Sequence, residues 1–248
     1  MEKIQKNKFK FGLLGRNISY SFSKGYFTEK FKKMALDNYS YTNFDIATLE
    51  EFSLIFQDDI VGLNVTTPYK EQVIPYLDDL DVAAKKIAAV NTIKVVGDRL
   101  IGYNTDIFGF EESLKPVLEK HHIRALILGT GGASKAIRFV LEKLSIEFLV
   151  VSRNPTGTQI SYQEISKDIL KAHTLIINCT PLGTFPNVEK SPNIPYQYIT
   201  EKHLLYDLIY NPQKTAFLKK GEAQAALIKN GLQMLELQAE KSWEIWNT

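Results

Sequence analysis

The chain has 248 residues, which is long enough for one large domain or for two smaller domains with separate cores. Its hydrophobic fraction of 44%, its charged fraction of 23% and its formal net charge of +2 are those of an ordinary globular protein and give no reason to expect binding to nucleic acid or to a membrane. The apolar runs are too short for a signal peptide or a membrane span, and the single cysteine, Cys179, excludes an intrachain disulfide, so we predict a cytoplasmic protein with a buried thiol.

The first hundred residues alternate short apolar strands with helical patterns. Strands are predicted at 9–14, 39–44 and 60–65, and helices at 23–36, 49–56, 70–77 and 81–89. This alternation predicts a mostly parallel sheet with helices on both faces. The segments 92–96 and 99–103 are predicted to pair as a β-hairpin, because Gly97-Asp98 between them is a strong two-residue turn signal.

A second α/β unit is predicted after a boundary near residues 103–106. It starts with an amphipathic helix at 106–119, its strands are expected at 123–128, 148–151, 174–179, 204–208 and 226–228, and a last helix is expected at 231–246. Residues 180–195 contain four prolines and are predicted to form an irregular loop. Because long loops in compact domains are usually functional, we expect this loop to line a ligand site.

A glycine-rich segment joins the strand at 123–128 to a helical pattern at 135–144. It reads Gly129-Thr130-Gly131-Gly132-Ala133-Ser134. Gly129 allows a tight turn, Gly131 allows close approach of the backbone to a pyrophosphate, and Ser134 is small enough to replace the third glycine of the usual pattern. The segment therefore predicts a dinucleotide-phosphate site.

The cofactor is indicated by the end of the next strand. NAD sites usually carry an acidic residue about 20 residues after the glycines, where it accepts from the ribose hydroxyl. Here the strand ends in Ser152-Arg153-Asn154, which offers a guanidinium and no carboxylate. Taken alone, Arg153 is most simply a solvated charge, but after the glycine segment it favours a 2′-phosphate and so predicts NADP.

Polar side chains also follow the strands of the first unit, at the edge where open α/β sheets bind ligands. Each has a structural explanation of its own: Ser23 and Asp106 could be helix N-caps, Lys70 a solvated charge and Asn91 a turn residue. Their joint occurrence with a nucleotide segment favours a ligand site. The residues are Ser21, Ser23, Asn64, Thr66, Lys70, Asn91 and Asp106.

From about Phe9 to Trp246 the chain resembles the shikimate dehydrogenases. The segments that carry the resemblance occur in the family's order: Ser21-Phe-Ser23, Asn64-Val-Thr-Thr-Pro-Tyr-Lys70, Ala89-Val-Asn-Thr92, Asn104-Thr-Asp106, Gly129 to Ser134, Asn178-Cys-Thr-Pro-Leu-Gly183, Tyr206-Asp-Leu-Ile-Tyr-Asn-Pro212 and Gln238-Ala239. Gln233 departs from the family, which usually has a glycine there.

The resemblance implies two α/β domains with the active site in the cleft between them. The substrate domain would comprise 1–103 and 233–248, and a Rossmann-like NADP domain would comprise 104–232. It also implies reversible, NADP-dependent reduction of 3-dehydroshikimate to shikimate in aromatic amino-acid synthesis, by a monomer or a homodimer whose partner is a small molecule and which needs no metal. A broader quinate/shikimate dehydrogenase using NAD stays open, and so does a nucleotide-binding sensor without turnover.

The resemblance also assigns roles to individual residues. Ser21 and Ser23, helped by Tyr210, would hold the substrate carboxylate. Lys70 would be the main proton-transfer group and Asp106 its partner at the hydroxyl that is oxidised. The ring hydroxyls would be bound by Asn64, Thr66, Asn91 and Gln238. The cofactor would contact Gly129, Thr130, Gly131, Gly132, Ala133, Ser152, Arg153, Asn154, Thr180, Leu208, Gly231 and Met234, with Tyr210 also near the nicotinamide.

Overall fold

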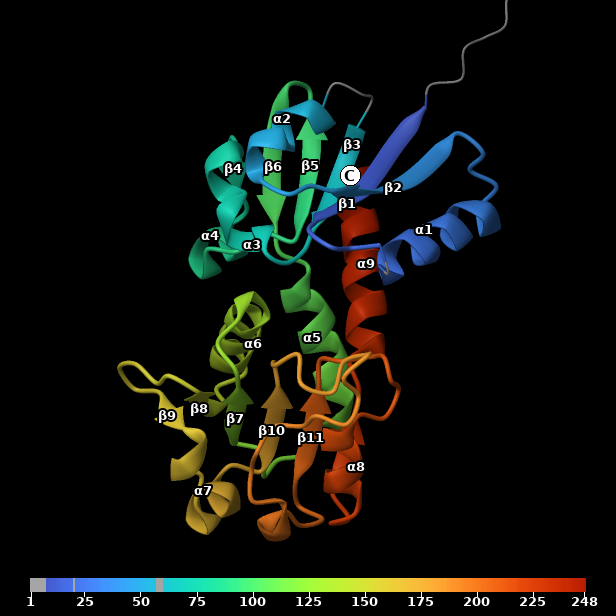
Figure 1. The fold of residues 1–248 in the computed structure, drawn as a ribbon. Coiled ribbons are helices and arrows are strands. Elements are labelled where there is room, and N and C mark those ends of the chain that lie inside the picture. Colours follow the sequence, from blue (N-terminus) through green and yellow to red (C-terminus); the bar gives the residue numbers. More distant parts are fainter. Residues whose placement is uncertain (1–7, 20, 57–59) are drawn as a thin grey trace, which may run out of the picture. The chain divides into compact units, whose positions relative to one another are not determined.

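The computed structural model describes residues 8–19, 21–56 and 60–248, which form two compact units (Figure 1). The first unit runs to Thr105 and includes Ala239–Thr248, and the second is Asp106–Gln238. We expected the first boundary two residues earlier. Asn104 and Thr105 stay with the first unit because Asn104 Nδ2 donates to the carbonyl of Ala89 at 3.0 Å and the Thr105 N–H donates to Asn91 Oδ1 at 2.7 Å.

The first unit contains a six-stranded mixed sheet. In spatial order its strands are β2 (Tyr39–Asp45), β1 (Phe9–Gly15), β3 (Ile60–Val65), β5 (Thr92–Val96), β6 (Arg99–Tyr103) and β4 (Asp79–Leu80). The predicted hairpin is confirmed as β5 and β6. Three of the five pairings are parallel, and β5 runs antiparallel to both neighbours. The start of β5 therefore lies at the same edge as the carboxyl end of β3.

Helices cover both faces of this sheet. They are α1 (Phe22–Lys33), α2 (Phe52–Ile55) after a 3₁₀ turn at Leu49–Glu51, α3 (Tyr69–Gln72) with a 3₁₀ turn at Ile74–Tyr76, and α4 (Val82–Ile87). The helix expected at 70–77 is split, because Pro75 has no N–H to continue the α-helical bonding. The N-cap of α1 is Ser21, so the interpretation of Ser23 as the cap was wrong.

A hydrophobic core of this unit includes residues of the last helix. Ala239 and Trp246 of α9 (Leu232–Asn247) pack with Phe11 and Phe27. The Trp246 indole occupies the space that a Cβ on Gly62 would need, and its Nε1 donates to the carbonyl of Ile93 at 2.9 Å. The last ten residues are therefore an integral part of the first unit.

The second unit contains a six-stranded sheet that is parallel throughout. In spatial order its strands are β12 (Leu227–Lys229), β11 (Leu204–Asp207), β10 (Leu175–Asn178), β7 (Arg124–Leu128), β8 (Glu147–Ser152) and β9 (Ile160–Ser161). Numbered within the unit and read from β9, this is the order 3-2-1-4-5-6 of dinucleotide-binding folds. The strand order reverses between β7 and β10, where such folds bind their ligand.

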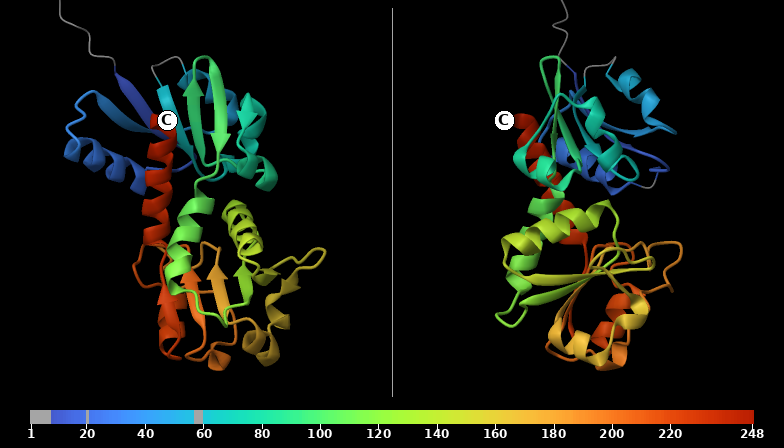
Figure 2. Two further views of the ribbon diagram at one scale, coloured as in Figure 1. Left: turned by 180° about the vertical axis from the view of Figure 1, so that it is seen from behind. Right: turned by 90° about the vertical axis from the view of Figure 1, so that its left-hand side faces the viewer.

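The helices of the second unit lie on both sides of its sheet (Figure 2). The helix expected at 106–119 ends at Leu114, and Pro116 stands in the 3₁₀ turn that follows. The helix after the glycines begins at Gly132, three residues before the helical pattern that we had identified. The helices are α5 (Asp106–Leu114), α6 (Gly132–Lys143), α7 (Lys167–Ala172), α8 (Ala216–Glu222) and the first part of α9, with 3₁₀ turns at Lys115–Val117, Tyr162–Glu164 and Tyr196–Tyr198.

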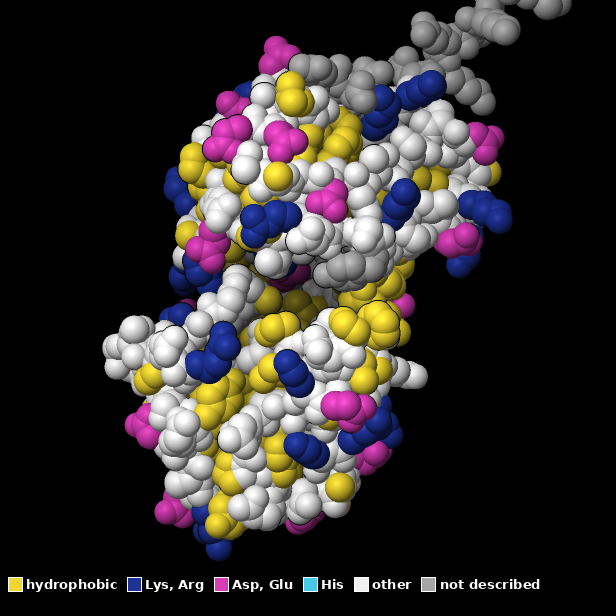
Figure 3. Space-filling model, in the orientation of Figure 1, with side chains coloured by type: hydrophobic (Ala, Val, Ile, Leu, Met, Phe, Trp, Pro, Cys, Tyr) yellow, Lys and Arg dark blue, Asp and Glu magenta, His cyan; other side chains and the backbone are white. Residues whose placement is uncertain are grey.

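Within the described ranges, no helix combines the length and the apolar character that a membrane crossing requires. The face drawn in Figure 3 carries lysine and arginine interspersed with aspartate and glutamate. On that face the charge distribution agrees with the small net charge of the chain.

Candidate active site

The two serines expected at the substrate carboxylate lie at the N-terminus of α1. The Ser21 hydroxyl oxygen accepts from the Ser23 N–H at 3.2 Å, and Ser23 is buried. The first turn of a helix exposes unpaired N–H groups and a partial positive charge, which favour an anion there. Both hydroxyls therefore stand where a carboxylate is electrostatically favoured.

The segments that carry Lys70 and Asn91 are joined by a hydrogen bond between backbone groups. Lys70 lies in α3, which is anchored by a 2.8 Å hydrogen bond from the Tyr69 hydroxyl to the carbonyl of Ile46. The carbonyl of Lys70 accepts from the Val90 N–H at 2.7 Å, directly before Asn91. Thr66, also expected here, follows β3 and its N–H donates to the carbonyl of Leu14. The first unit thus brings Thr66, Lys70 and Asn91 to the carboxyl end of β3.

Asn64 is buried at the end of β3 and its hydrogen bonds are made inside the first unit. Its Oδ1 accepts from the Tyr41 hydroxyl at 2.7 Å, and its Nδ2 donates to Ser242 Oγ at 2.9 Å and to Thr92 Oγ1 at 3.3 Å. A side-chain amide has two N–H hydrogens, so both are used. Asn64 can therefore meet a ring hydroxyl only as an acceptor.

The other expected substrate residues belong to the second unit. Asp106 is the first residue of α5 and is 7% exposed, so it stands inside the helix and the interpretation as the residue before the helix was wrong. Gln238 is also 7% exposed, and its Nε2 donates to the carbonyl of Leu235 at 2.9 Å. Tyr210 is half-buried and follows β11. A carboxylate in the first turn of a helix is stabilised by the helix dipole.

A cavity of about 680 Å³ lies at the carboxyl edge of the second sheet. Seven of the expected cofactor residues line it: Gly129, Thr130, Gly131, Ser152, Arg153, Asn154 and Thr180. The other lining residues were not predicted individually: Val151, Tyr162, Gln163, Cys179, Pro181, Leu182, Ser191 and Asn193. Five of the lining residues fall in the proline-rich loop 180–195, which was predicted to line a ligand site.

The backbone around the glycines has the shape that a pyrophosphate requires. Gly129 has φ +106°, and a Cβ there would lie 3.0 Å from the Thr180 side chain. No atom lies within 4 Å of a Cβ on Gly131, which is the N-cap of α6 and gives that helix no side-chain cap. The Ser134 hydroxyl donates to the carbonyl of Gly131 at 2.7 Å and is almost fully buried. The start of α6 is therefore open to a phosphate group.

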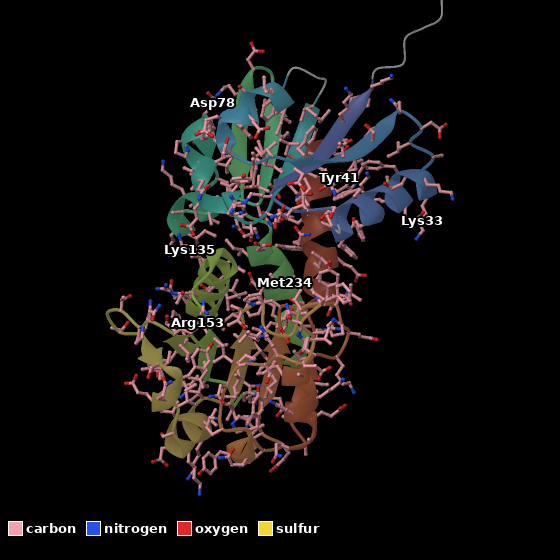
Figure 4. The ribbon with its side chains drawn as sticks, in the orientation of Figure 1. Lys33, Tyr41, Asp78, Lys135, Arg153 and Met234 are labelled. Carbon is pink, nitrogen blue, oxygen red and sulfur yellow. The ribbon has the colours of Figure 1, made fainter. Side chains whose placement is uncertain are left out.

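Among the described residues that line the cavity, Arg153 is the only cation and none is a carboxylate. Arg153 (labelled in Figure 4) is exposed just after β8. Burial raises the pKa of the neighbouring Tyr162, and the positive charge of Arg153 opposes that rise. The Asn154 N–H donates to Ser152 Oγ at 3.2 Å. The geometry fits a ligand with a phosphate group at this end of the cavity.

Five expected cofactor residues do not line this cavity: Gly132, Ala133, Leu208, Gly231 and Met234. Gly132 and Ala133 form the first turn of α6. Leu208 and Gly231 touch each other, because a Cβ on Gly231 would lie 2.1 Å from the carbonyl oxygen of Leu208. Met234 is buried in the first turns of α9 (Figure 4). Gln233, which departs from the family, is exposed and accepts from the Lys229 ammonium.

Buried side chains at the carboxyl ends of β10 and β11 form hydrogen bonds next to the loop that carries Thr180. The Asn178 Nδ2 donates to Asp207 Oδ1 at 3.0 Å, and Asp207 also accepts from the Thr215 hydroxyl at 2.5 Å. Burial raises the pKa of Asp207 to about 6. Cys179 follows β10 and is partly exposed as a residue, whereas its thiol was expected to be buried. Burial of its sulfur against protein atoms raises the pKa of the thiol, which favours its neutral form.

Comparison with known proteins identifies the family. Residues 13–93 match the model of the shikimate dehydrogenase substrate binding domain. The NADP(+) shikimate dehydrogenase of Clostridium botulinum is 36% identical over 246 residues, which cover 95% of each chain. The crystal structure of shikimate dehydrogenase 1 from Peptoclostridium difficile is 38% identical and has a TM-score of 0.84, covering 97% of this chain and 92% of that one.

A further solved structure shows the same fold with ligands. The shikimate 5-dehydrogenase of Thermus thermophilus in complex with NADP(H) and shikimate is 30% identical and has a TM-score of 0.85, covering 96% of this chain and 93% of that one. The identity to the botulinum relative extends over almost the whole chain, and motifs of the sequence follow the carboxyl ends of strands in both sheets. The chain therefore belongs to the shikimate dehydrogenase family.

Proposed function

We propose that the protein catalyses the reversible, NADP-dependent reduction of 3-dehydroshikimate to shikimate. The observation that carries the proposal is the cavity of the second unit, which combines an uncapped helix start beside Gly131 with Arg153 and has no described carboxylate in its lining. This donor set fits a dinucleotide with a 2′-phosphate. The match to dehydrogenases of this name over 95% of the chain supports the substrate.

NADP supplies the chemistry of accepting or giving a hydride when it is bound. The protein has to position the secondary alcohol and move its proton. In this proposal Lys70 transfers the proton at the alcohol oxygen, and Asp106 orients the same hydroxyl. Ser21 and Ser23 hold the carboxylate at the start of α1, with Tyr210 as a further contact. The ring hydroxyls are bound by Asn64, Thr66, Asn91 and Gln238.

The cofactor would be held by the residues of the second unit. Gly129 to Ala133 offer backbone N–H groups to the pyrophosphate, while Ser152, Arg153 and Asn154 bind the 2′-phosphate. Thr180 lines the same cavity, and Leu208, Gly231 and Met234 are assigned to the nicotinamide end. We further propose that the protein acts in the cytoplasm, as a monomer or a homodimer.

The test is a comparison of initial rates with shikimate and quinate, each with NADP and with NAD. We expect the catalytic efficiency for shikimate with NADP to exceed that for quinate by at least about 100-fold, because a site fitted to one carboxylate geometry leaves a polar group unpaired with the other. Comparable efficiencies for the two acids, or a preference for NAD, would replace the proposal with a quinate/shikimate dehydrogenase. Absence of turnover with purified, folded protein would leave the nucleotide-binding sensor as the remaining alternative.

A further inference from the structure

The hydroxyl of Thr92 lies where the side chains of two asparagines meet. Thr92 opens β5 and stands opposite Asn64 of β3 in the antiparallel register. Its Oγ1 is 3.3 Å from Asn64 Nδ2 and 3.2 Å from Asn91 Oδ1. One hydroxyl thus bridges Asn64 and Asn91, the residue that the proposed function assigns to the ring hydroxyls of the substrate.

Backbone groups in contact with Asn64 and Asn91 determine which atom donates and which accepts in these hydrogen bonds. The carbonyl of Asn91, which can only accept, lies 3.4 Å from Asn64 Nδ2 and identifies this atom as the amide nitrogen, whose two hydrogens are shared among Asn91, Ser242 and Thr92; Thr92 Oγ1 therefore accepts in its contact with Asn64. The Thr105 N–H, which can only donate, lies 2.7 Å from Asn91 Oδ1. Asn91 Oδ1 is therefore the acceptor, and the Thr92 hydroxyl donates to it. The bonds run from Asn64 through Thr92 to Asn91.

Two side chains that are distant in the sequence extend this hydrogen-bonded group: Ser242 contacts Thr92, and Tyr41 contacts Asn64. Ser242 Oγ of α9 lies 2.8 Å from Thr92 Oγ1, and the Tyr41 hydroxyl (labelled in Figure 4) donates to Asn64 Oδ1 at 2.7 Å. Thr92 and Ser242 are 0% exposed, Asn91 is 3% exposed and Asn64 is 4% exposed. At this degree of burial a hydrogen bond that is lost leaves a polar group unpaired, which is costly.

We propose that Thr92 is a positioning residue whose hydroxyl holds the Asn91 amide in the orientation that binds the substrate. The inference rests on the proposed function for the role of Asn91. A hydroxyl that served strand packing alone would be dispensable, because valine has the same shape as threonine and favours strands equally. The side chains of Asn64 and Ser242 contact the Thr92 hydroxyl directly, and Tyr41 in turn holds Asn64.

The experiment compares Thr92→Val, which keeps the shape and removes the hydroxyl, with Thr92→Ser, which keeps the hydroxyl and removes a methyl group. For Thr92→Val we expect the KM for shikimate to rise about tenfold, kcat to change less than about threefold, and the KM for NADP to stay within about twofold. For Thr92→Ser we expect all three within about twofold of the wild type. Equal KM values for shikimate in the two variants would overturn the proposal.

Two further variants separate positioning from general destabilisation. Ser113→Ala removes another fully buried hydroxyl, which lies 2.6 Å from the Tyr206 hydroxyl in the second unit, and should lower stability without changing the KM for shikimate. In an Asn91→Ala background, Thr92→Val should have less than about a twofold further effect on that KM, because the positioned group is gone. A tenfold further rise in that background would contradict the proposal.

A measurement without turnover distinguishes this inference from the proposed function. Denaturant unfolding of Thr92→Val, Asn91→Ala and the double variant should show a loss in the double variant that is smaller than the sum of the single losses. Additive losses would overturn the contact between the two residues. If the wild type fails to oxidise shikimate with NADP, the proposed function fails, while this unfolding cycle still tests the bridge. If Thr92→Val does not fold, Ser242→Ala replaces it, with an expected rise in the KM for shikimate of about threefold; an unchanged KM would overturn the proposal.

Discussion

The Thr180 hydroxyl donates to the side-chain oxygen of Asn178 at 2.6 Å, and this short bond ties the loop 180–195 to the inside of the second sheet. Asn178 is fully buried at the carboxyl end of β10, whereas Thr180 lines the cavity. The Thr180 N–H donates to the same oxygen at 3.0 Å. The loop after β10 therefore starts from a fixed direction, although most of its residues have no regular secondary structure.

Arg153 is expected to determine the choice between the two dinucleotides. A 2′-phosphate gains charge-assisted hydrogen bonds from a guanidinium, each worth about 1.5 to 3 kcal/mol, which corresponds to about 10- to 150-fold in affinity. Arg153→Ala should raise the KM for NADP by this factor and leave the KM for NAD nearly unchanged. Arg138→Ala, which removes another exposed arginine of the same unit that lies over the Phe148 ring, is the control. Equal weakening of both cofactors would make Arg153 a structural residue.

Lys70 and Asp106 are expected to affect turnover more than binding. Lys70→Ala should lower kcat by about 10² to 10⁴, which is the usual contribution of a general acid or base, and should change the KM for shikimate much less. Asp106→Asn should also slow the reaction, and the double variant should lose less than the product of the two effects. Steady-state kinetics with Lys85→Ala as an exposed control provides the measurement. Near-normal turnover of Lys70→Ala would assign the proton transfer to another group.

Gly231 and Gly25 should respond in opposite directions to the same substitution. A Cβ on Gly231 would lie 2.1 Å from the carbonyl oxygen of Leu208, so Gly231→Ala forces the backbone apart and should destabilise the protein by about 1 to 3 kcal/mol or more. A Cβ on Gly25, in the exposed part of α1, meets nothing within 4 Å, so Gly25→Ala should stabilise by about 0.5 to 1 kcal/mol. Thermal melts of both variants test the pair. An unchanged melting temperature of Gly231→Ala would show that the backbone at Leu208 can move away at little energetic cost.

Stability should fall as the pH decreases from 7.5 to 5.5. Burial lowers the pKa of His122, His173 and His203 below the usual value of 6.5. Below pH 6.5 the unfolded chain binds protons that the folded chain does not, so the free energy of unfolding falls with decreasing pH. Asp207 acts in the opposite direction, because burial raises its pKa from 3.8 to about 6 and the folded state binds its proton first.

Variants separate the two contributions to this pH dependence. His173→Gln removes one of the three histidines and should make the decrease in melting temperature between pH 7.5 and 5.5 shallower, whereas Asp207→Asn removes the opposing group and should make it steeper. The measurement is a series of thermal melts at constant ionic strength. A wild-type melting temperature that rises toward pH 5.5 would contradict the assignment of neutral, buried histidines.

The elements that the sequence predicted well are those with strong local signals. Gly97-Asp98 predicted the hairpin, and the helical pattern after the glycines predicted the start of α6 to within three residues. The strands β4 and β9 were not predicted, because each has only two paired residues and no alternation can be recognised over that length. The helix α8 was also missed: it is seven residues long and contains Gly221, which a Leu205 side chain approaches closely.

The site was predictable where one segment carries several of its residues, and less so where distant segments meet. The motifs after β3, β7 and β8 contain most of the candidate site residues that the structure brings together within each unit. Tyr162 and Gln163 reach the cavity from the 3₁₀ turn at Tyr162–Glu164, and no local pattern marks them. The bridge through Thr92 depends on Ser242, which lies 150 residues further along the chain. Only the pairing of β3 with β5 and the packing of α9 bring these groups together.

The return of the chain end to the first unit has a consequence for biosynthesis. Ribosomes deliver the chain from its N-terminus, and domains generally fold as they emerge. The second unit is one continuous segment, so its sheet needs no residue from outside 106–238. The first unit is discontinuous, and the space at Gly62 can be filled only after Trp246 has been synthesised. The unit whose synthesis begins first is therefore completed by residues that are added after the whole of the second unit.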